Sequence, residues 1–196
     1  MFRGNAAVII LPLLLMGFIF YGGYHYLNTS GQLTNEELDT VVSFVVEADS
    51  HGSKHTITGY WDWKEMPVDG MLGHDYIGVK FVEEEQDSFD PQLISGSALQ
   101  LLHGEQVIFE TEGTLVLDGI IFEFPNEVQE HIGYGNKGSF EIELDSKLYS
   151  GNEVSISYLH TWEEHEGFSF DHARLSKENV DIEHWIIERF TTIPTQ

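Results

Sequence analysis

The sequence predicts a mostly β protein, an antiparallel β-sandwich that follows one N-terminal transmembrane helix. Three observations carry this prediction: one uncharged apolar run near the start, many short segments in which apolar and polar residues alternate, and glycine-containing turns between those segments. Immunoglobulin-like packing of two sheets fits the pattern, and a small closed barrel is the alternative.

The N-terminal run predicts a membrane anchor. Residues 4–24 contain no charged side chain, and Ala6–Tyr21 is almost wholly apolar. About 20 helical residues span a hydrocarbon core of about 30 Å. We therefore expect a short cytoplasmic start at 1–4 and a transmembrane signal anchor at 5–27.

The charges around this run predict its orientation. Arg3 precedes it, and the positive-inside preference keeps that end in the cytoplasm. A cleaved signal peptide is the competing interpretation, but the aromatic residues at the exit, Tyr24 and Tyr26, suit a membrane interface. The predicted localisation is the cell membrane, single-pass, with the C-terminal domain outside the cytoplasm.

The segment after the anchor predicts a tether at 28–39, which leads into an acidic extracytoplasmic β domain at 40–196. Residues 28–34 are small and polar. Thr34 and Glu37 have the spacing of a capping box, so a short helical turn is expected before the first strand.

Short apolar segments predict the strands of the domain. We expect them at 41–48, 55–64, 74–82, 98–102, 107–111, 114–117, 120–124, 139–144 and 154–159. The pairs Glu112-Gly113 and Asp118-Gly119 predict hairpin turns, because glycine accepts positive φ. Residues 181–190 fit both helical and strand spacing, and a strand is favoured.

The charge of the chain limits its partners. It has 33 Asp and Glu against 9 Lys and Arg, a formal net charge of −24, and no Lys or Arg lies between residues 81 and 136. Nucleic-acid binding needs cations that neutralise phosphates, so this class of partner is excluded. Adaptation of an exported surface to salt or high pH explains such a charge without any specific ligand.

Two clusters are candidate cation sites. The acidic cluster 83–90 offers carboxylates for Ca²⁺, although it lacks the spacing of an EF-hand loop. The histidine patch 160–172 offers His160, Glu163, His165 and His172 for Zn²⁺, without a helical H-E-x-x-H arrangement. Solvated or turn histidines are the alternative interpretation of this patch.

Trp61 and Trp63 share one face of a predicted strand, with Tyr60 on the other face. Two indoles side by side form a platform for sugar rings. The same alternation is produced by a pair of tryptophans that faces the core.

These patterns together predict a non-enzymatic binding or accessory module of the cell envelope, with an envelope protein or wall component as partner and no cofactor. The sequence has no G-x-S-x-G elbow, phosphate-binding glycine loop or dinucleotide fingerprint. Two alternatives stay open: a cation-binding domain that uses one of the two clusters, and a hydrolase with a dispersed carboxylate site.

Overall fold

The computed structural model describes residues 6–29, 33–81, 90, 93–145 and 151–195. The chain divides into two compact units, Met1–Gln32 and Leu33–Gln196. The first contains helix α1 (Ala6–Thr29), whose side chains are described over residues 10–24. Within the described part of the chain, no helix is long and apolar enough to cross a membrane. The expected helix is therefore present, and its transmembrane character gains no support from the structure.

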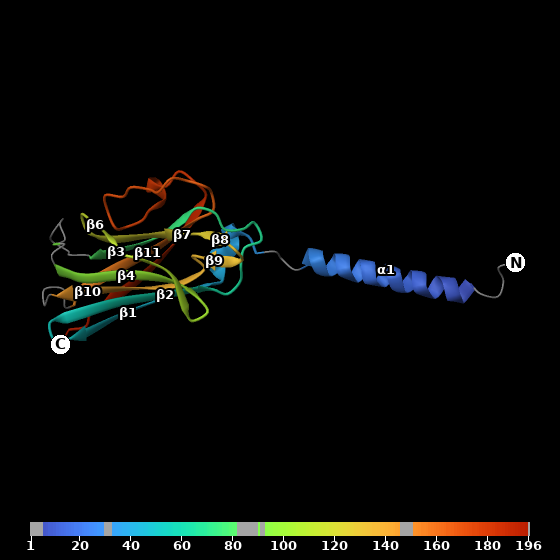
Figure 1. The fold of residues 1–196 in the computed structure, drawn as a ribbon, viewed down its shortest axis with the longest axis horizontal. Coiled ribbons are helices and arrows are strands. Elements are labelled where there is room, and N and C mark those ends of the chain that lie inside the picture. The colour runs from blue at the N-terminus through green and yellow to red at the C-terminus, as the bar shows by residue number, and fades with distance from the viewer. Residues whose placement is uncertain (1–5, 30–32, 82–89, 91–92, 146–150, 196) are drawn as a thin grey trace. The chain divides into compact units, whose positions relative to one another are not determined.

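The second unit consists of two five-stranded antiparallel sheets, drawn as two layers in Figure 1. Sheet A has the strand order β1-β2-β10-β4-β5, and sheet B has the order β12-β11-β3-β7-β6. The strands of sheet A are β1 (Val42–His51), β2 (Lys54–Trp63), β10 (Lys137–Asp145), β4 (Ile94–His103) and β5 (Gln106–Thr111). Those of sheet B are β12 (His184–Thr192), β11 (Glu153–Thr161), β3 (His74–Phe81), β7 (Gly119–Pro125) and β6 (Thr114–Val116). The predicted antiparallel sandwich is confirmed.

The core lies between the inner faces of the two sheets. Alternation along β2 directs Ile57, Trp61 and Trp63 inward, and β11 contributes Ile156 and Tyr158. All five are buried, so each contributes roughly 1.5–3 kcal/mol through removal of apolar surface from water. The core is complete within this unit, because every member of its two buried clusters lies between Leu38 and Ile193.

The outer faces of the two sheets differ. A segment that follows β11 folds back over the outer face of sheet B, visible in orange and red above that sheet in Figure 1. Its residues Ala173, Leu175 and Val180 are buried against Tyr76 of β3 and Ile121 of β7. The outer face of sheet A instead carries exposed side chains.

Close backbone approach explains why this covering segment reaches sheet B. A Cβ at Gly78 or at Gly119 would collide with the backbone oxygen of Ala173 or of Val79, respectively. The carboxylate of Asp118 accepts a hydrogen bond from the Ala173 N–H at 2.6 Å, which holds the segment at that point. Glycine is needed here because space is lacking for any side chain.

Three short elements complete the unit. The 3-10 helix η1 (Asn35–Thr40) occupies the expected helical turn, although the Thr34 side chain makes no capping hydrogen bond. The 3-10 helix η4 (Lys177–Asn179) belongs to the covering segment. A two-stranded hairpin, β8 (Glu127–Gln129) and β9 (Ile132–Tyr134), was absent from the sequence prediction because each strand has only three residues.

The structure corrects one predicted turn and supports another. The chain passes from sheet A to sheet B at Glu112-Gly113, so this pair is a crossover and the predicted hairpin turn is wrong. Asp118-Gly119 does connect the paired strands β6 and β7. Neither Gly113 nor Gly119 is among the glycines with positive φ, so the reason given for both turns was wrong. In the ambiguous segment 181–190, residues 184–190 are strand, as expected, and they form most of β12, whereas residues 181–183 precede the strand.

Candidate functional site

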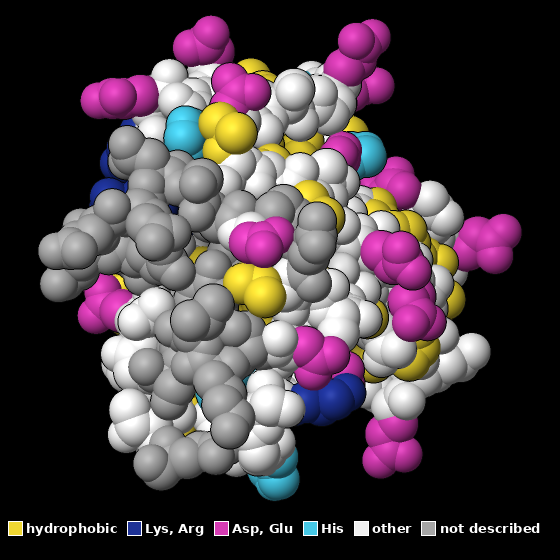
Figure 2. Space-filling model, turned by 90° about the vertical axis from the view of Figure 1, so that its left-hand side faces the viewer, with side chains coloured by type: hydrophobic (Ala, Val, Ile, Leu, Met, Phe, Trp, Pro, Cys, Tyr) yellow, Lys and Arg dark blue, Asp and Glu magenta, His cyan; other side chains and the backbone are white. Residues whose placement is uncertain are grey.

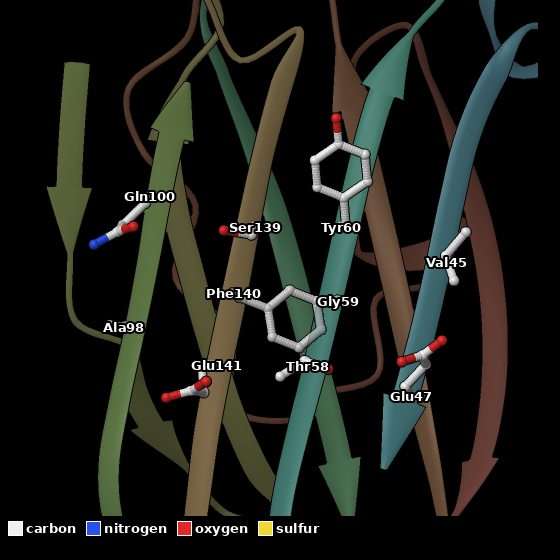
Figure 3. A pocket seen from close by; sticks show the side chains of 10 residues that line it. All are labelled: Val45, Glu47, Thr58, Gly59, Tyr60, Ala98, Gln100, Ser139, Phe140 and Glu141. Carbon is white, nitrogen blue, oxygen red and sulfur yellow. The ribbon is translucent and has the colours of Figure 1, made fainter. Parts of the chain in front are cut away.

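The outer face of sheet A contains a shallow groove that crosses β1, β2, β10 and β4 (Figure 3). Strand pairing arranges its side chains in two rows. The first row runs Val45, Tyr60, Ser139, Gln100, and the second runs Glu47, Thr58, Glu141, Ala98. Adjacent positions in a row are about 4.8 Å apart, and the rows are separated by about 6.8 Å along the strands.

Side-chain size gives the groove its shape. In each row small side chains alternate with longer ones: Thr58 lies between Glu47 and Glu141, and Ser139 lies between Tyr60 and Gln100. The groove has a volume of about 530 Å³, within the range of about 300–1,000 Å³ that is typical of small-ligand sites. It therefore has the dimensions of a binding site open to solvent.

Two aromatic residues line the groove: Tyr60, of which 36% is exposed, and Phe140, which is buried. The Tyr60 hydroxyl donates a long hydrogen bond of 3.5 Å to Asp62, which also pairs with Lys64 at 3.1 Å. The ammonium of Lys137 lies 5.9 Å from the centre of the Tyr60 ring, within cation–π range. These neighbours restrict the ring while leaving part of it open to solvent.

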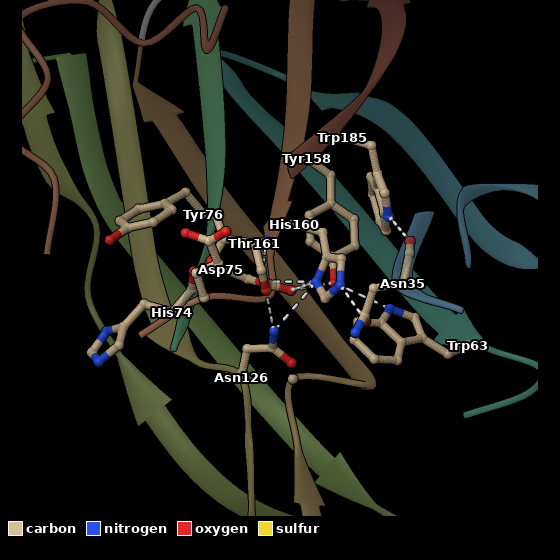
Figure 4. Close-up of polar contacts among 12 residues, drawn as sticks. Asn35, Trp63, His74, Asp75, Tyr76, Asn126, Tyr158, His160, Thr161 and Trp185 are labelled. Atoms are coloured by element: carbon tan, nitrogen blue, oxygen red, sulfur yellow. Dashed lines mark hydrogen bonds and ion pairs between the residues drawn. The ribbon is translucent and has the colours of Figure 1, made fainter. Parts of the chain in front are cut away.

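A buried polar network lies between the two sheets, at the end of β3 and β11 (Figure 4). His160 Nδ1 lies 3.0 Å from both carboxylate oxygens of Asp75, and neither side chain is exposed. Asp75 also accepts hydrogen bonds from the Tyr158 hydroxyl at 2.9 Å and the Thr161 N–H at 3.1 Å. These contacts join β3 to β11 through one buried carboxyl group.

The hydrogen bonds of the network orient the ring of His160. Asn35 donates its amide N–H to the Gly70 carbonyl at 2.9 Å, so its amide oxygen faces His160 Nε2, also at 2.9 Å. That oxygen can only accept, so Nε2 carries a proton. Nδ1 faces the Asp75 carboxyl group at 3.0 Å and the Asn126 amide nitrogen at 3.4 Å.

Tryptophan rings surround His160. The ring centres of Trp185, Trp63 and Trp162 lie 4.8, 4.9 and 5.5 Å from that of His160. These rings separate the His160–Asp75 pair from water. Because His160 and Asp75 are wholly buried, a ligand in solvent cannot reach them.

Tyr76 occupies a second aromatic cluster beneath the covering segment of sheet B. Its hydroxyl lies 3.1 Å from His165 Nε2 and accepts the Phe168 N–H at 3.1 Å. Burial raises the pKa of Tyr76 well above its usual value, and the charge of Glu123 raises it further. The cluster holds the segment in place and leaves no groove of its own.

A second depression, of about 600 Å³, lies where the covering segment meets sheet B. Lys80 lies 3.4 Å from Asp118 and Arg174 lies 3.0 Å from Glu188, and Lys177 also lines the depression. An anionic ligand would have to displace these two ion pairs, so this depression is the weaker candidate for a binding site.

The structure separates the four candidate zinc ligands. His160 belongs to the buried network, His165 contacts Tyr76, and His172 lies 3.2 Å from Asp118. Glu163 is exposed, and its carbonyl faces His165 Nδ1. Among the described residues, no group of three or more His, Cys, Asp or Glu is arranged to hold a metal ion. Of the acidic cluster 83–90, only Asp90 lies within the described residues.

The proposed tryptophan platform is contradicted by burial. Trp61 is 0% exposed and Trp63 is 4% exposed. Their indole N–H groups donate to the Gly135 carbonyl at 2.7 Å and to the Tyr158 hydroxyl at 3.2 Å, respectively. The core-facing interpretation of the pair is therefore confirmed, and the aromatic residue of β2 that solvent can reach is Tyr60.

Sequence reasoning missed both the groove and the buried network. Glu141 was placed on the solvent face of its strand, but its neighbours in the groove come from strands far apart in the sequence. For the network, the available signal was a lone acidic residue in an apolar strand: Asp75 precedes Tyr76 and Ile77 in β3. A buried charge needs partners, so such a residue indicates a polar network.

Acidic side chains dominate the surface drawn in Figure 2, and Lys and Arg show in few places. In the groove, Glu47 and Glu141 are exposed carboxylates separated by one strand, which places their Cα atoms roughly 10 Å apart. The groove is therefore rich in hydrogen-bond acceptors and repels anions.

Comparisons with known proteins add a fold-level likeness only. No family model matches the chain, and no curated protein matches it. Among solved structures, it is similar to one described as "AvmM Catalyzes Macrocyclization in Alchivemycin A Biosynthesis", with 9% sequence identity and a TM-score of 0.41. The match covers 80% of this chain and 89% of that one. A TM-score this low carries no argument about function. The structure itself defines the class of protein, an antiparallel β-sandwich with one open sheet face.

Proposed function

We propose that the protein is a membrane-anchored, non-enzymatic binding module of the cell envelope, and that it binds its partner on the outer face of sheet A. One observation carries this proposal. The chain covers the outer face of sheet B with its own segment, whereas the outer face of sheet A carries an open groove. The partner we propose is a wall component outside the cytoplasm.

The proposed anchor is supported by the composition of α1. Its large apolar side chains between Ile10 and Tyr24 are exposed, and a lipid environment would remove them from water. No charged residue lies between Gly4 and Tyr24, and Arg3 precedes the run. In this proposal α1 holds the domain at the membrane and the domain lies outside the cytoplasm.

Fractionation of cells tests the anchor. The full-length protein is expected to remain in the membrane pellet after an alkaline carbonate wash, and the domain to be degraded by protease added to wall-stripped cells. Recovery of the full-length protein in the soluble fraction without detergent would refute the anchor. The pair Leu14→Arg and Leu14→Ile provides the matched test, since only the arginine adds a charge, which costs about 2.5–3.5 kcal/mol at the centre of a membrane helix.

The non-enzymatic part of the proposal is supported by where the histidine–carboxylate pair lies. A histidine next to a carboxylate orients proton transfer in many hydrolases, but the substrate must reach the histidine. His160 and Asp75 are both 0% exposed, and both ring nitrogens of His160 already have hydrogen-bond partners within the protein. In this proposal the pair has a structural role in the core.

Sedimentation with purified envelope material tests the binding. Residues 33–196 contain the complete core, so this domain is used without α1. We expect it to pellet with the envelope fraction and Ser139→Arg, which fills the floor of the groove, to stay in the supernatant. Thr192→Arg adds the same charge to an exposed position on β12 and is expected to pellet like the parent domain. Equal pelleting of all three proteins would refute the groove as the binding surface.

A hydrolase is the second candidate, and one observation favours it. Glu47 and Glu141 face the same groove with one strand between them, and paired carboxylates of inverting glycosidases are about 6.5–9.5 Å apart. Release of new reducing ends from envelope glycan by the domain, abolished by Glu141→Gln, would establish this activity and refute the non-enzymatic role.

A further inference from the structure

We propose that the ligand of the sheet A groove is a saccharide without anionic groups, and that Tyr60 packs against a sugar ring while Glu47 and Glu141 accept its hydroxyl protons. This inference rests on the proposed function, because it takes the groove as the binding surface. It adds the chemical class of the ligand and the role of each residue.

The hydrogen-bonding groups of the groove call for a ligand that is rich in donors. The carboxylates of Glu47 and Glu141 only accept, and they are set on either side of the Thr58 hydroxyl. Gln100 and Ser139, neighbours in the first row, can both donate and accept. A sugar presents hydroxyl groups at several positions of one ring and satisfies this mixture.

The aromatic residue supplies a complementary apolar surface. The ring of Tyr60 borders the small side chain of Ser139 on the adjacent strand, so a flat ligand ring can reach the sheet beside it. Carbon–hydrogen bonds on one face of a sugar ring pack against an aromatic face and remove apolar surface from water. Lys137 lies 5.9 Å from the centre of the Tyr60 ring and keeps the ring oriented.

The lining of the groove argues against other ligand classes. Its aliphatic side chains, Val45 and Ala98, lie at opposite ends of the two rows, so the lining offers no continuous aliphatic track for a lipid chain. Polyanions such as uronic-acid chains meet two exposed carboxylates and a domain with large negative charge. Hydroxyl-rich neutral chains and amino sugars match both the acceptors and the charge.

The basic peptide is the competing ligand, because Glu47 and Glu141 would also attract lysine. It does not account for the Tyr60 ring beside a flat floor, or for the amide and hydroxyl groups of the first row. A peptide held by charge alone would also weaken strongly with salt, whereas a ligand held by stacking and hydrogen bonds would not.

A titration with defined oligosaccharides tests the inference. Domain 33–196 is titrated with cellotetraose, chitotetraose, a chitosan tetramer, tetragalacturonate and pentalysine, and binding is followed by amide chemical shifts in 0.15 M salt. We expect at least one of the first three to bind and tetragalacturonate not to bind. Tyr60→Ala is expected to weaken binding about 10-fold or more, and Tyr60→Phe, which keeps the ring, to weaken it less.

A matched pair of variants distinguishes binding in the groove from a general effect of negative charge. Glu141→Gln is expected to weaken binding of the saccharide at least about 5-fold, whereas Glu153→Gln makes the same change on β11 of sheet B and is expected to leave binding intact. Binding of pentalysine alone, or of tetragalacturonate as tightly as of the neutral sugars, would overturn the inference. If no saccharide binds while the domain still pellets with envelope through the groove, the saccharide inference fails and the proposed function stands. If the domain does not pellet either, the proposed function fails.

Discussion

His160 and Asp75 form a hydrogen-bonded pair that is wholly buried, with the imidazole Nδ1 3.0 Å from both carboxyl oxygens. The pair ties β11 to β3, and through Asn35 it also contacts helix η1. The same helix is held to the core by the buried side chain of Leu38 and by the hydrogen bond from the Trp185 indole to the Asn35 carbonyl at 3.0 Å.

Removal of either partner should destabilise the domain strongly. Asp75→Ala and His160→Ala each leave a buried charged or polar group without its partner, and the expected loss is about 3–5 kcal/mol in the free energy of unfolding. The double variant should lose less than the sum of the two single losses, because the groups interact. Urea unfolding measures all three, and His103→Ala, at an exposed position of β4, is expected to change stability by less than about 0.5 kcal/mol. If the loss in the double variant equals the sum of the two single losses, the two side chains do not interact and the pair is contradicted.

The protonation of His160 is open to direct measurement. Nε2 faces the amide oxygen of Asn35, which can only accept, and Nδ1 faces Asp75. In a nitrogen-15 correlation spectrum at pH 7, we expect the Nε2 of this histidine to carry a proton. A spectrum in which Nε2 carries no proton would contradict the contact with Asn35.

The absence of a side chain at Gly78 lets the covering segment approach sheet B closely. Gly78→Ala places a methyl group against the Ala173 carbonyl, so the segment must move away from β3. We expect a loss of about 1–3 kcal/mol in the free energy of unfolding and faster amide exchange at Ala173. Gly52→Ala, in the exposed turn between β1 and β2, is the comparison. Glycine is favoured there by its backbone φ of +66°, and no atom would crowd an added Cβ. An unchanged exchange rate at Ala173 in Gly78→Ala would contradict the close contact.

The raised pKa values of two buried tyrosines lead us to expect a loss of stability at alkaline pH. Burial raises the pKa of Tyr158 well above its usual value, as does the adjacent carboxylate of Asp75, and burial raises the pKa of Tyr76 in the same direction. Above about pH 10 the unfolded chain releases these phenolic protons and the folded chain retains them. The free energy of unfolding should therefore be unaffected by these groups below about pH 10 and should fall as the pH rises beyond it.

Unfolding curves between about pH 9 and pH 12 measure this effect. Each tyrosine that stays protonated in the fold contributes a slope of up to about 1.4 kcal/mol per pH unit. Tyr158→Phe should reduce the slope by about that amount, apart from its loss of stability at neutral pH. A slope identical to that of the parent domain would show that Tyr158 ionises without unfolding.

Most strands of the fold were predictable from local patterns: strands such as β2 and β10 alternate in burial, whereas β3 and β11 are apolar runs buried on both faces. In β10, Phe140 and Ile142 face the core while Glu141 faces solvent, and the sequence alone indicates this. The assignment of 181–190 to a strand succeeded for the same reason. The crossover at Glu112-Gly113 was not predictable, since a turn and a passage between sheets use the same residues.

The groove depends on strand order, which no local pattern reveals. β10 lies between β2 and β4 in sheet A. Tyr60 and Ser139 are therefore neighbours although they lie far apart in the sequence. The buried network is equally non-local, because His160, Asp75 and Asn35 come from three separate elements. The sequence indicates which residues face solvent, and topology decides which of them meet.

Chemical-shift mapping on domain 33–196 tests the central claim most directly. Soluble glycan fragments released from purified envelope are added to the labelled domain until the shifts stop changing. The account predicts that the largest changes occur at Tyr60, Gln100 and Ser139, which lie side by side on the outer face of sheet A. Changes confined to sheet B, or the absence of any change at saturating fragment, would contradict it.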